Sequence, residues 1–438
     1  MFKYNVKLAG KSMRRNPIMT GLMVAAIAVG IGVSMTTLTV HYMMSSDPIP
    51  QKSDVLFAVT IDSWNPLRPF NDDRPERAPH QLTFHDAQRL VELGAAPRQT
   101  AMFETSLIVE PEADDMLPFE VGARATYGDF FPMFDVPFVY GSGWDRSADQ
   151  SAETVVVLTR ELNERLFGGE DSVGERLTMG GRQFQVVGVI DTWEPTPRFY
   201  DSINGGFQEV NEMFIPYTLA LPLELASTGS DWGWKSEDIN SFEDWLNSEA
   251  CWVQYFIELD SPRDRNEYVA HLDAYVGEQK KLGRFERPMN NGIHDVMEWM
   301  EYHEVVANDA KVLLGLSFLF LLVCLLSTIA LLLTKFVGKQ SEISLRRALG
   351  ASRIQIFKQQ LVEVSVIGFT GGLIGLGLAG LGLEGIKAIY DAPNGMVSLD
   401  WVMVFTAVGI SIASGILAGL YPAWRVCQIP PATQLKTQ

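Results

Sequence analysis

The strongest constraint on the fold is a set of four apolar stretches that are nearly free of charge. Ile18–Val40 and Val312–Leu333 contain no charged residue, and each is long enough for a helix to cross a hydrocarbon core, which takes about 20 residues. A third stretch, Leu361–Leu383, carries the single acid Glu363, and a fourth, Trp401–Leu420, carries no charge. The pattern predicts four transmembrane helices and excludes a soluble protein.

The first stretch also has the flanks of a secretory signal peptide. Basic residues without any acid precede it, namely Lys3, Lys7, Lys11, Arg14 and Arg15. The apolar core of a signal peptide has about 7–15 residues, however, so this longer run predicts a membrane anchor.

The charge distribution predicts the topology. Residues 41–311 carry 21 Lys and Arg against 48 Asp and Glu, whereas the rest of the chain carries 14 against 5. Between the second and third stretches, six basic residues face only Glu342. Since excess Lys and Arg in short loops marks the cytoplasmic side, both termini and the 335–360 loop are expected inside and the long acidic segment outside.

The predicted fold class is therefore a membrane protein with four transmembrane α-helices and a large mixed α/β extracytoplasmic domain inserted between helices 1 and 2. The expected order is a cytoplasmic segment 1–17, helix 18–41, extracytoplasmic domain 42–305, helix 306–334, cytoplasmic coupling loop 335–360, helix 361–384, external loop 385–399, helix 400–420 and cytoplasmic tail 421–438.

Local signals in the acidic segment indicate mixed α/β structure. Val155–Leu158 is typical of a strand, and Thr159 is placed to cap a helix over Arg160–Phe167. Leu177–Met179 and Phe184–Ile190 flank a Gly-Gly turn and predict a β-hairpin.

Further signals are spread along the same segment. Thr83 precedes apolar residues at helical spacing and predicts a capped helix. Residues 191–250 read as long irregular loops, Trp252–Leu259 as a strand and Asp264–Val276 as a helix. Apolar residues from Ile293 onward predict a helix that either continues unbroken into the second span or packs on its own domain.

The basic loop contains a predicted pair of short helices. Ser341 is expected to cap the first and Gly350 to end it, while Ser352 caps the next. The apolar and basic side chains of the first helix suit docking onto another protein; the alternative is a helix lying on anionic lipid. The candidate interface residues are Glu342, Ile343, Leu345, Arg346, Arg347, Ala348, Leu349 and Gly350.

Small residues form two faces on the predicted membrane helices. Gly21, Ala25, Ala28 and Gly32 share a face of the first, and Gly368, Gly371, Gly372 and Gly375 form small-xxx-small pairs on the third. Such faces join either two copies of the chain or helices of one bundle; a dimer contact is favoured for the first helix and bundle packing for the third. Glu363, about one turn inside its helix, is expected to neutralise a basic neighbour or to reach the interface, rather than to relay protons.

No catalytic, cofactor or metal site is predicted. The histidines (His41, His80, His85, His271, His294 and His303) include no H-E-x-x-H pair and no cysteine at zinc spacing. His294 and Glu298 are expected on one face of a solvated helix, and the acids Glu110, Glu112, Asp114 and Asp115 in an exposed loop. The cysteines, Cys251, Cys324 and Cys427, offer no disulfide within the acidic domain, which leaves its compartment open. The acidity argues against a nucleic-acid partner.

Two segments carry a family resemblance. The run EISLRRALGASRIQIFKQQLVE, a glycine-rich span and the closing AGLYPAWRVCQIPPATQLK together resemble the FtsX-type permease domain of MacB-like ABC transporters. Thr154–Ile190 resembles the periplasmic core domain of that family. The resemblance covers the first anchor, about a third of the acidic domain and the C-terminal membrane half; residues 191–250, with Trp193, Trp232, Trp234 and Trp245, fit it poorly.

The resemblance implies a permease subunit in the bacterial inner membrane that works as a dimer, with a second copy or a paralogue. A separate ATPase, which binds ATP and Mg, would dock on the helix at 341–349; a periplasmic adaptor, an outer-membrane channel and membrane lipids are further expected partners. This chain shows no G-x-x-x-x-G-K-[ST] loop, since Gly10, Lys11 and Ser12 follow Asn5 where a glycine is needed. It is therefore expected to be non-catalytic.

The cargo stays open between a drug, a peptide and a lipoprotein-like substrate, to be exported or relayed. The alternative function is FtsX-like transmembrane signalling, in which the outer domain acts on an envelope partner and nothing crosses the bilayer. A membrane-anchored hydrolase is a third reading, which lacks a catalytic constellation.

Overall fold

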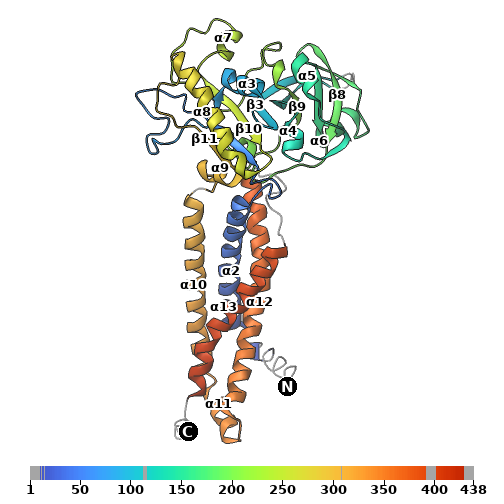
Figure 1. Ribbon diagram of the computed structural model, residues 1–438. Helices are drawn as coiled ribbons and strands as arrows, with labels where there is room; N and C mark the ends of the chain where they lie inside the picture. Colours follow the sequence, from blue (N-terminus) through green and yellow to red (C-terminus); the bar gives the residue numbers. More distant parts are fainter. Residues whose placement is uncertain are drawn as a thin grey trace. The chain divides into compact units, whose positions relative to one another are not determined.

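The computed structural model describes residues 10, 12–13, 15–111, 116–306, 308–390 and 401–428. The chain divides into two compact units (Figure 1). The membrane unit comprises Met1–Ser45 and Val306–Gln438, and the inserted domain comprises Ser46–Val305.

The membrane unit is built from four long helices and one short one. The long helices are α2 (Pro17–Ser45), α10 (Asn308–Val337), α12 (Arg353–Tyr390) and α13 (Trp401–Cys427), and the short one is α11 (Gln340–Ala348). Each long helix is sufficiently apolar and extended to span a membrane, as predicted. Helix α2 packs against α10 and α12, and α13 packs against α12 (Figure 1).

Several helix boundaries differ from the expectation: α2 continues to Ser45, α12 to Tyr390 and α13 to Cys427, past the expected ends at 41, 384 and 420. Helix α12 already begins at Arg353, so the segment between α10 and α12 is shorter than the predicted loop 335–360. The helix α9 (Val296–Tyr302) ends before Glu304, whose φ of 51° is left-handed, and α10 begins only at Asn308. Of the two alternatives for the helix after Ile293, the one that continues unbroken into the second span is therefore wrong. Residues 391–400, within the expected loop 385–399 and the start of the fourth helix, lie outside the described residues.

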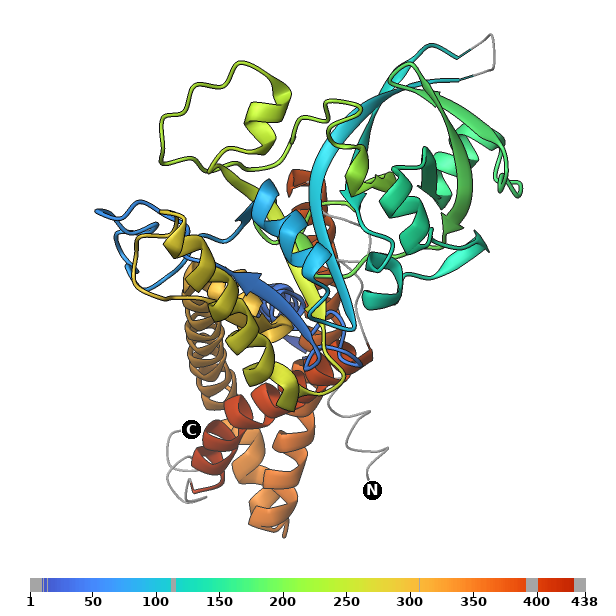
Figure 2. The same cartoon turned by 45° about the horizontal axis from the view of Figure 1, so that its top comes forward.

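The inserted domain contains one mixed sheet in the order β11-β1-β10-β3-β4-β9-β6-β8-β5, with β2 beside β10 and β7 between β3 and β8. β4 and β9, and likewise β6 and β8, run parallel, while the other pairs are antiparallel. The long strand β3 bends through the domain (Figure 2) and pairs with β10 at one end and β7 at the other. The strands are β1 (Leu56–Thr60), β2 (Leu82–Thr83), β3 (Arg98–Glu110), β4 (Phe119–Thr126), β5 (Phe138–Gly141), β6 (Val155–Thr159), β7 (Arg176–Met179), β8 (Arg182–Ile190), β9 (Met213–Pro216), β10 (Cys251–Glu258) and β11 (Gly292–Asp295).

Helices cover both faces of this sheet, because its central strands are apolar on both faces. In β6, Val156 and Leu158 join one core, while Val155 and Val157 join the other. The first core includes residues of α3 (Phe84–Leu93), α6 (Arg160–Phe167) and α8 (Arg265–Lys281). The second includes residues of α4 (Phe130–Met133), α5 (Arg146–Ser151), α9 and the 3-10 turn η1 (Phe199–Asp201).

Most local predictions for this domain are confirmed. Thr83 and Thr159 cap α3 and α6 with their side chains, and the hairpin forms as β7 and β8. The irregular stretch 191–250 differs, because it contributes β9, the turns η1 and η2 (Tyr217–Leu219) and the short helix α7 (Phe242–Leu246). β9 has only four residues, all of them buried. Its sequence therefore lacked the alternation of apolar and polar residues, and the length, by which a strand is predicted.

Candidate functional site

The short helix α11 is fastened to the membrane unit along one side. Its N-cap is Lys339, with no side-chain capping bond, so the expected cap at Ser341 is wrong and that residue lies inside the helix. Ile343 is 7% exposed and packs in the core that contains Phe336, Ile356 and others. A partner therefore cannot reach Ile343, which supports α11 instead of extending the expected docking surface.

Polar contacts fix the same side of α11. Arg346 donates to Glu342 Oε1 at 2.6 Å and to Gln359 Oε1 of α12 at 3.1 Å. Glu342 also pairs with Arg15 at 3.3 Å. Arg346 and Glu342 thus hold the helix in place, and Arg347 is half-buried with contacts of its own.

The opposite edge of α11 is open. Leu345 is 57% exposed and Leu349 is 80% exposed, and Ala348 is exposed beside them. Gly350 follows with a φ of 101°, which ends the helix in a turn, and Ser352 then caps α12 through the backbone N–H of Gln355. We call Leu345, Ala348 and Leu349 the leucine edge. It is the exposed apolar part of the predicted interface, beside the partly exposed side chains of Glu342 and Arg346.

The two small-residue faces meet each other within one chain. A Cβ added to Gly375 would lie 2.8 Å from the carbonyl oxygen of Ala28, and one on Gly32 would lie 3.3 Å from that of Gly375. Gly371 contacts Ile27 in the same way, at 2.8 Å. These residues let α2 and α12 approach closely, as small residues do in lipid.

The remaining small residues divide into two groups. Gly368 lies against Gly415 of α13, where a Cβ on Gly415 would be 3.1 Å from the Gly368 Cα, and Gly372 is buried. Gly21 and Ala25 are exposed on α2. Only this last pair remains open to a second copy of the chain.

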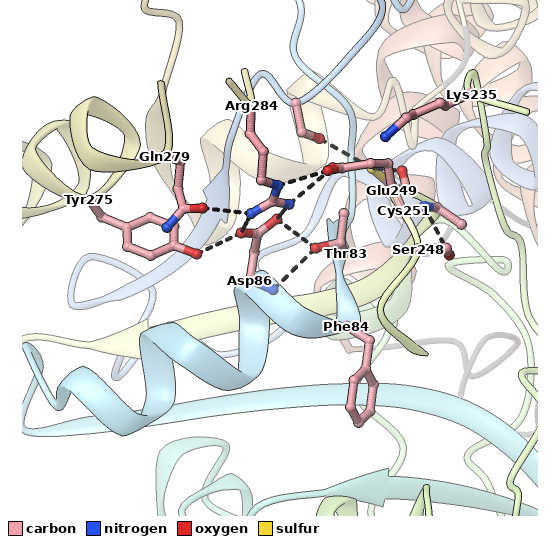
Figure 3. A network of polar contacts seen from close by, with 12 residues as sticks. Thr83, Phe84, Asp86, Lys235, Ser248, Glu249, Cys251, Tyr275, Gln279 and Arg284 are labelled. Carbon is pink, nitrogen blue, oxygen red and sulfur yellow. Dashed lines mark hydrogen bonds and ion pairs between the residues drawn. The ribbon is translucent and has the colours of Figure 1, made fainter. Parts of the chain in front are cut away.

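Inside the inserted domain, an ion network fastens α3 to the segment after α8 (Figure 3). Arg284 donates to both carboxylate oxygens of Asp86 at 2.8 Å, and to Glu249 Oε1 at 2.7 Å. Tyr275 donates to Asp86 at 2.6 Å and Thr83 caps the same turn. Burial opposes the charge on Arg284, but the hydrogen bonds that it donates to Glu249 and Asp86 outweigh this effect and raise its pKa. All members have partners, so the network is a structural clamp.

A second charged cluster lies fully inside the domain and escaped the sequence analysis. Arg124 of β4 and Arg198 both pair with Asp201 of η1, whose side chain is fully buried. Arg124 also donates to Asn211 Oδ1 at 2.9 Å, and Gln254 donates to Asp201 at 2.8 Å. Arg198 and Asp201 are three residues apart, but Arg124, Asn211 and Gln254 come from separate segments, so no local pattern marks the cluster.

Three histidines also come together where the sequence showed no motif. The rings of His80 and His303 lie 4.3 Å apart, and His294 is next to Tyr302 at 4.6 Å. His294 stands on strand β11, so the predicted helix face shared with Glu298 is wrong. No group of three or more His, Cys, Asp or Glu in the described parts of the chain is arranged to hold a metal ion.

These histidines predict a loss of stability in acid. Burial, with Arg77 and His294 nearby, lowers the pKa of His80 to about 4, and burial likewise lowers the pKa of His303 well below its usual value. Since the unfolded chain then binds more protons below pH ~6.5, stability present at neutral pH is lost as the pH falls toward about 4. For His80 alone the loss between pH ~7 and ~5 is about 2 kcal/mol. Thermal melting at the two pH values should show this loss in the parent, and a smaller loss in His80→Phe. If His80→Phe keeps the pH dependence of the parent, the assignment to His80 is refuted. His85→Phe, at an exposed position, is the control and should melt with the pH dependence of the parent.

The singled-out tryptophans and acids have ordinary surroundings. Trp245 stacks on Trp252, and Trp193 stacks on Tyr200 at 5.2 Å. Trp234 donates to the Ser63 carbonyl, while Trp232 is 46% exposed. Glu110 is exposed at the end of β3; Glu112, Asp114 and Asp115 lie outside the described residues.

The chain matches two family descriptions. Residues 20–275 match the MacB-like periplasmic core domain, and residues 314–431 match the FtsX-like permease C-terminal domain. The periplasmic region of MacB from Actinobacillus actinomycetemcomitans is a structural neighbour, with a TM-score of 0.36 and 15% identity over 59% of this chain and 96% of that one.

Among curated relatives, the macrolide export ATP-binding/permease protein MacB of Azoarcus sp. is 23% identical over 99% of this chain and 59% of its own length. The uncharacterized ABC transporter permease YknZ of Bacillus subtilis is 22% identical over 64% of this chain and 61% of its own. The chain thus spans about 60% of the first of these relatives. Because the periplasmic core match alone covers more than half of the chain, this protein belongs to the MacB-like family of ABC transporter permeases with an FtsX-like C-terminal domain.

Proposed function

We propose that this permease couples ATP hydrolysis by a separate ATPase subunit to conformational change of the inserted domain, and thereby exports or relays a substrate. The leucine edge carries the proposal: exposed apolar side chains lie on a helix whose other side is fixed to the membrane helices. Relatives named as ATP-binding/permease proteins combine the two activities, which supports an ATPase as the partner. ATP and Mg would bind to that partner.

The basic loop supports an orientation in the bacterial inner membrane. Lys and Arg outnumber Asp and Glu around α11, as expected of a cytoplasmic segment, so the acidic inserted domain faces the opposite side. The macrolide export named for relatives makes a drug one candidate cargo, beside a peptide or a lipoprotein-like molecule. A second permease copy, an adaptor and an outer-membrane channel would complete such an assembly.

A Leu345→Glu/Leu349→Glu double variant tests the docking surface. Two carboxylates on the leucine edge would be desolvated on contact, so we expect copurification of the ATPase from mild detergent to fall at least about tenfold, which corresponds to only 1.4 kcal/mol of binding. Lys358→Glu, which adds a negative charge at an exposed position of α12, is the control and should bind normally. Equal ATPase recovery with the double variant would place the docking surface elsewhere.

The second candidate function, transmembrane signalling, is favoured by one observation. Among the described residues of the four long helices, no charged side chain lies within 18–40, 312–334, 364–383 or 405–424. Glu363 borders the uncharged stretch of α12 but lies well inside this helix, which begins at Arg353, so the expected position about one turn from the helix start is wrong. A protein that signals needs no polar path. ATP-dependent accumulation of cargo by reconstituted vesicles separates the two functions, because signalling alone accumulates none.

A further inference from the structure

One carboxylate at an end of the membrane unit collects contacts from several segments. Ser12 Oγ donates to Glu363 Oε1 at 2.5 Å, and Lys335 Nζ lies 2.8 Å from the same oxygen. Lys339 Nζ lies 3.0 Å from Oε1 and 3.1 Å from Oε2. Lys335 also reaches Thr20 Oγ1 of α2 at 3.4 Å. Glu363 of α12 thereby joins the segment before α2, α10 and the start of α11.

These charges are withdrawn from solvent. The side chain of Lys335 is fully buried, that of Glu363 is 2% exposed and that of Lys339 is 16% exposed. An ion taken out of water is tolerated only with a partner, and removing one member of a buried pair strands the other. Since two ammonium groups share one carboxylate, the segments cannot part here without leaving a charge unpaired.

Lys339 connects this cluster to α11 directly. Its backbone N–H donates to the Phe336 carbonyl at 3.0 Å, and its carbonyl accepts from Ile343 at 3.1 Å, so it belongs to the turn between α10 and α11. Gly338 precedes it and would leave that turn free to bend. The bond from Lys339 to Glu363 removes this freedom, because the turn is held against α12.

We propose that Glu363 is a positioning residue, which locks α11 to α10 and α12 through Lys335 and Lys339, so that a displacement of α11 moves the membrane helices together. The proposal rests on the proposed function, in which an ATPase docks on α11. It separates two tasks: the leucine edge binds the ATPase, and the buried cluster transmits its movement.

The test compares variants in the reconstituted complex with the ATPase. In Glu363→Gln we expect ATPase recovery close to that of the parent, whereas the ATP-dependent change in hydrogen exchange of the inserted domain falls at least about tenfold. Lys339→Met removes the link from Glu363 to α11 together with the bond from Lys339 to Ser12, leaves Lys335 paired with Glu363 and should show the same loss. The swap Lys335→Glu/Glu363→Lys keeps the net charge but places a lysine opposite Lys339, so the link from Lys339 to α12 is lost and the response should stay reduced. Glu384→Gln, the same change at an exposed site of α12, is the control.

The outcomes distinguish this proposal from the proposed function. Lys339→Met with a full response to ATP would overturn the positioning role, even if Glu363→Gln fails to fold. If no ATPase binds the parent, the proposed function fails, and exchange of the α11 amides in the chain alone still decides the positioning role. Lys339→Met is then expected to speed their exchange about tenfold, and unchanged exchange would refute the lock.

Discussion

Replacement of Asp201 by alanine is expected to destabilise the inserted domain by about 3–5 kcal/mol, because it leaves two buried guanidinium groups without their shared carboxylate. The side chains of Arg124 and Asp201 are fully buried, and that of Arg198 is 1% exposed. Gln254 and Asn204 lose an acceptor as well, each at 2.8 Å. Since a domain has only about 5–15 kcal/mol of stability in total, the thermal midpoint in detergent should fall steeply.

The control for this prediction is Asp231→Ala, which removes the same group from an exposed loop and should leave the midpoint unchanged. Tryptophan fluorescence follows both variants, since tryptophans such as Trp252 and Trp299 are buried in the two cores of the domain. If Asp201→Ala has the same thermal midpoint as the parent, water or other side chains must bond Arg124 and Arg198. The cluster then does not contribute the stability that its burial indicates.

The features predictable from the sequence are those coded by neighbouring residues. The four apolar helices follow from uninterrupted runs, and α6 follows from a threonine cap, a short amphipathic stretch and Gly168, whose φ of 68° ends the helix. The hairpin of β7 and β8 likewise depends on an adjacent Gly-Gly turn. In each case the deciding interactions lie within about one turn of the residue concerned.

Features that depend on distant residues could not be predicted. The residues that contact Glu363 stand as far away in sequence as Ser12, and Asp201 collects partners from β4 and β10. In α11, the sequence pattern marked Ile343 and Leu345 alike as apolar surface. Only packing shows that Ile343 faces inward while Leu345 is open.

The glycine faces show the same limit, because a small residue in a membrane helix is equally suited to contacts within a bundle and between two chains. The four residues of α2 that were expected to form a dimer contact have two different environments. Ala28 and Gly32 pack against α12 of the same chain, whereas Gly21 and Ala25 are exposed. A substitution at a glycine between α2 and α12 should therefore lower the stability of the bundle, whereas one at a dimer contact should lower the dimer content.

Gly375→Val is expected to force α2 and α12 apart and to cost about 3 kcal/mol, because the added atoms meet a backbone that cannot rotate away. A Cβ at Gly375 would stand 2.8 Å from the Ala28 carbonyl oxygen and 3.0 Å from the Ile31 Cβ. Gly377→Val makes the same change on the same helix, where nothing lies within 4 Å, and is the matched control. The temperature at which the protein aggregates on heating in detergent should fall sharply for Gly375→Val and stay unchanged for Gly377→Val. If its melting is unchanged while native mass spectrometry shows lost dimers, Gly375 serves contact between chains, and the close approach of α2 to α12 is not what holds the bundle.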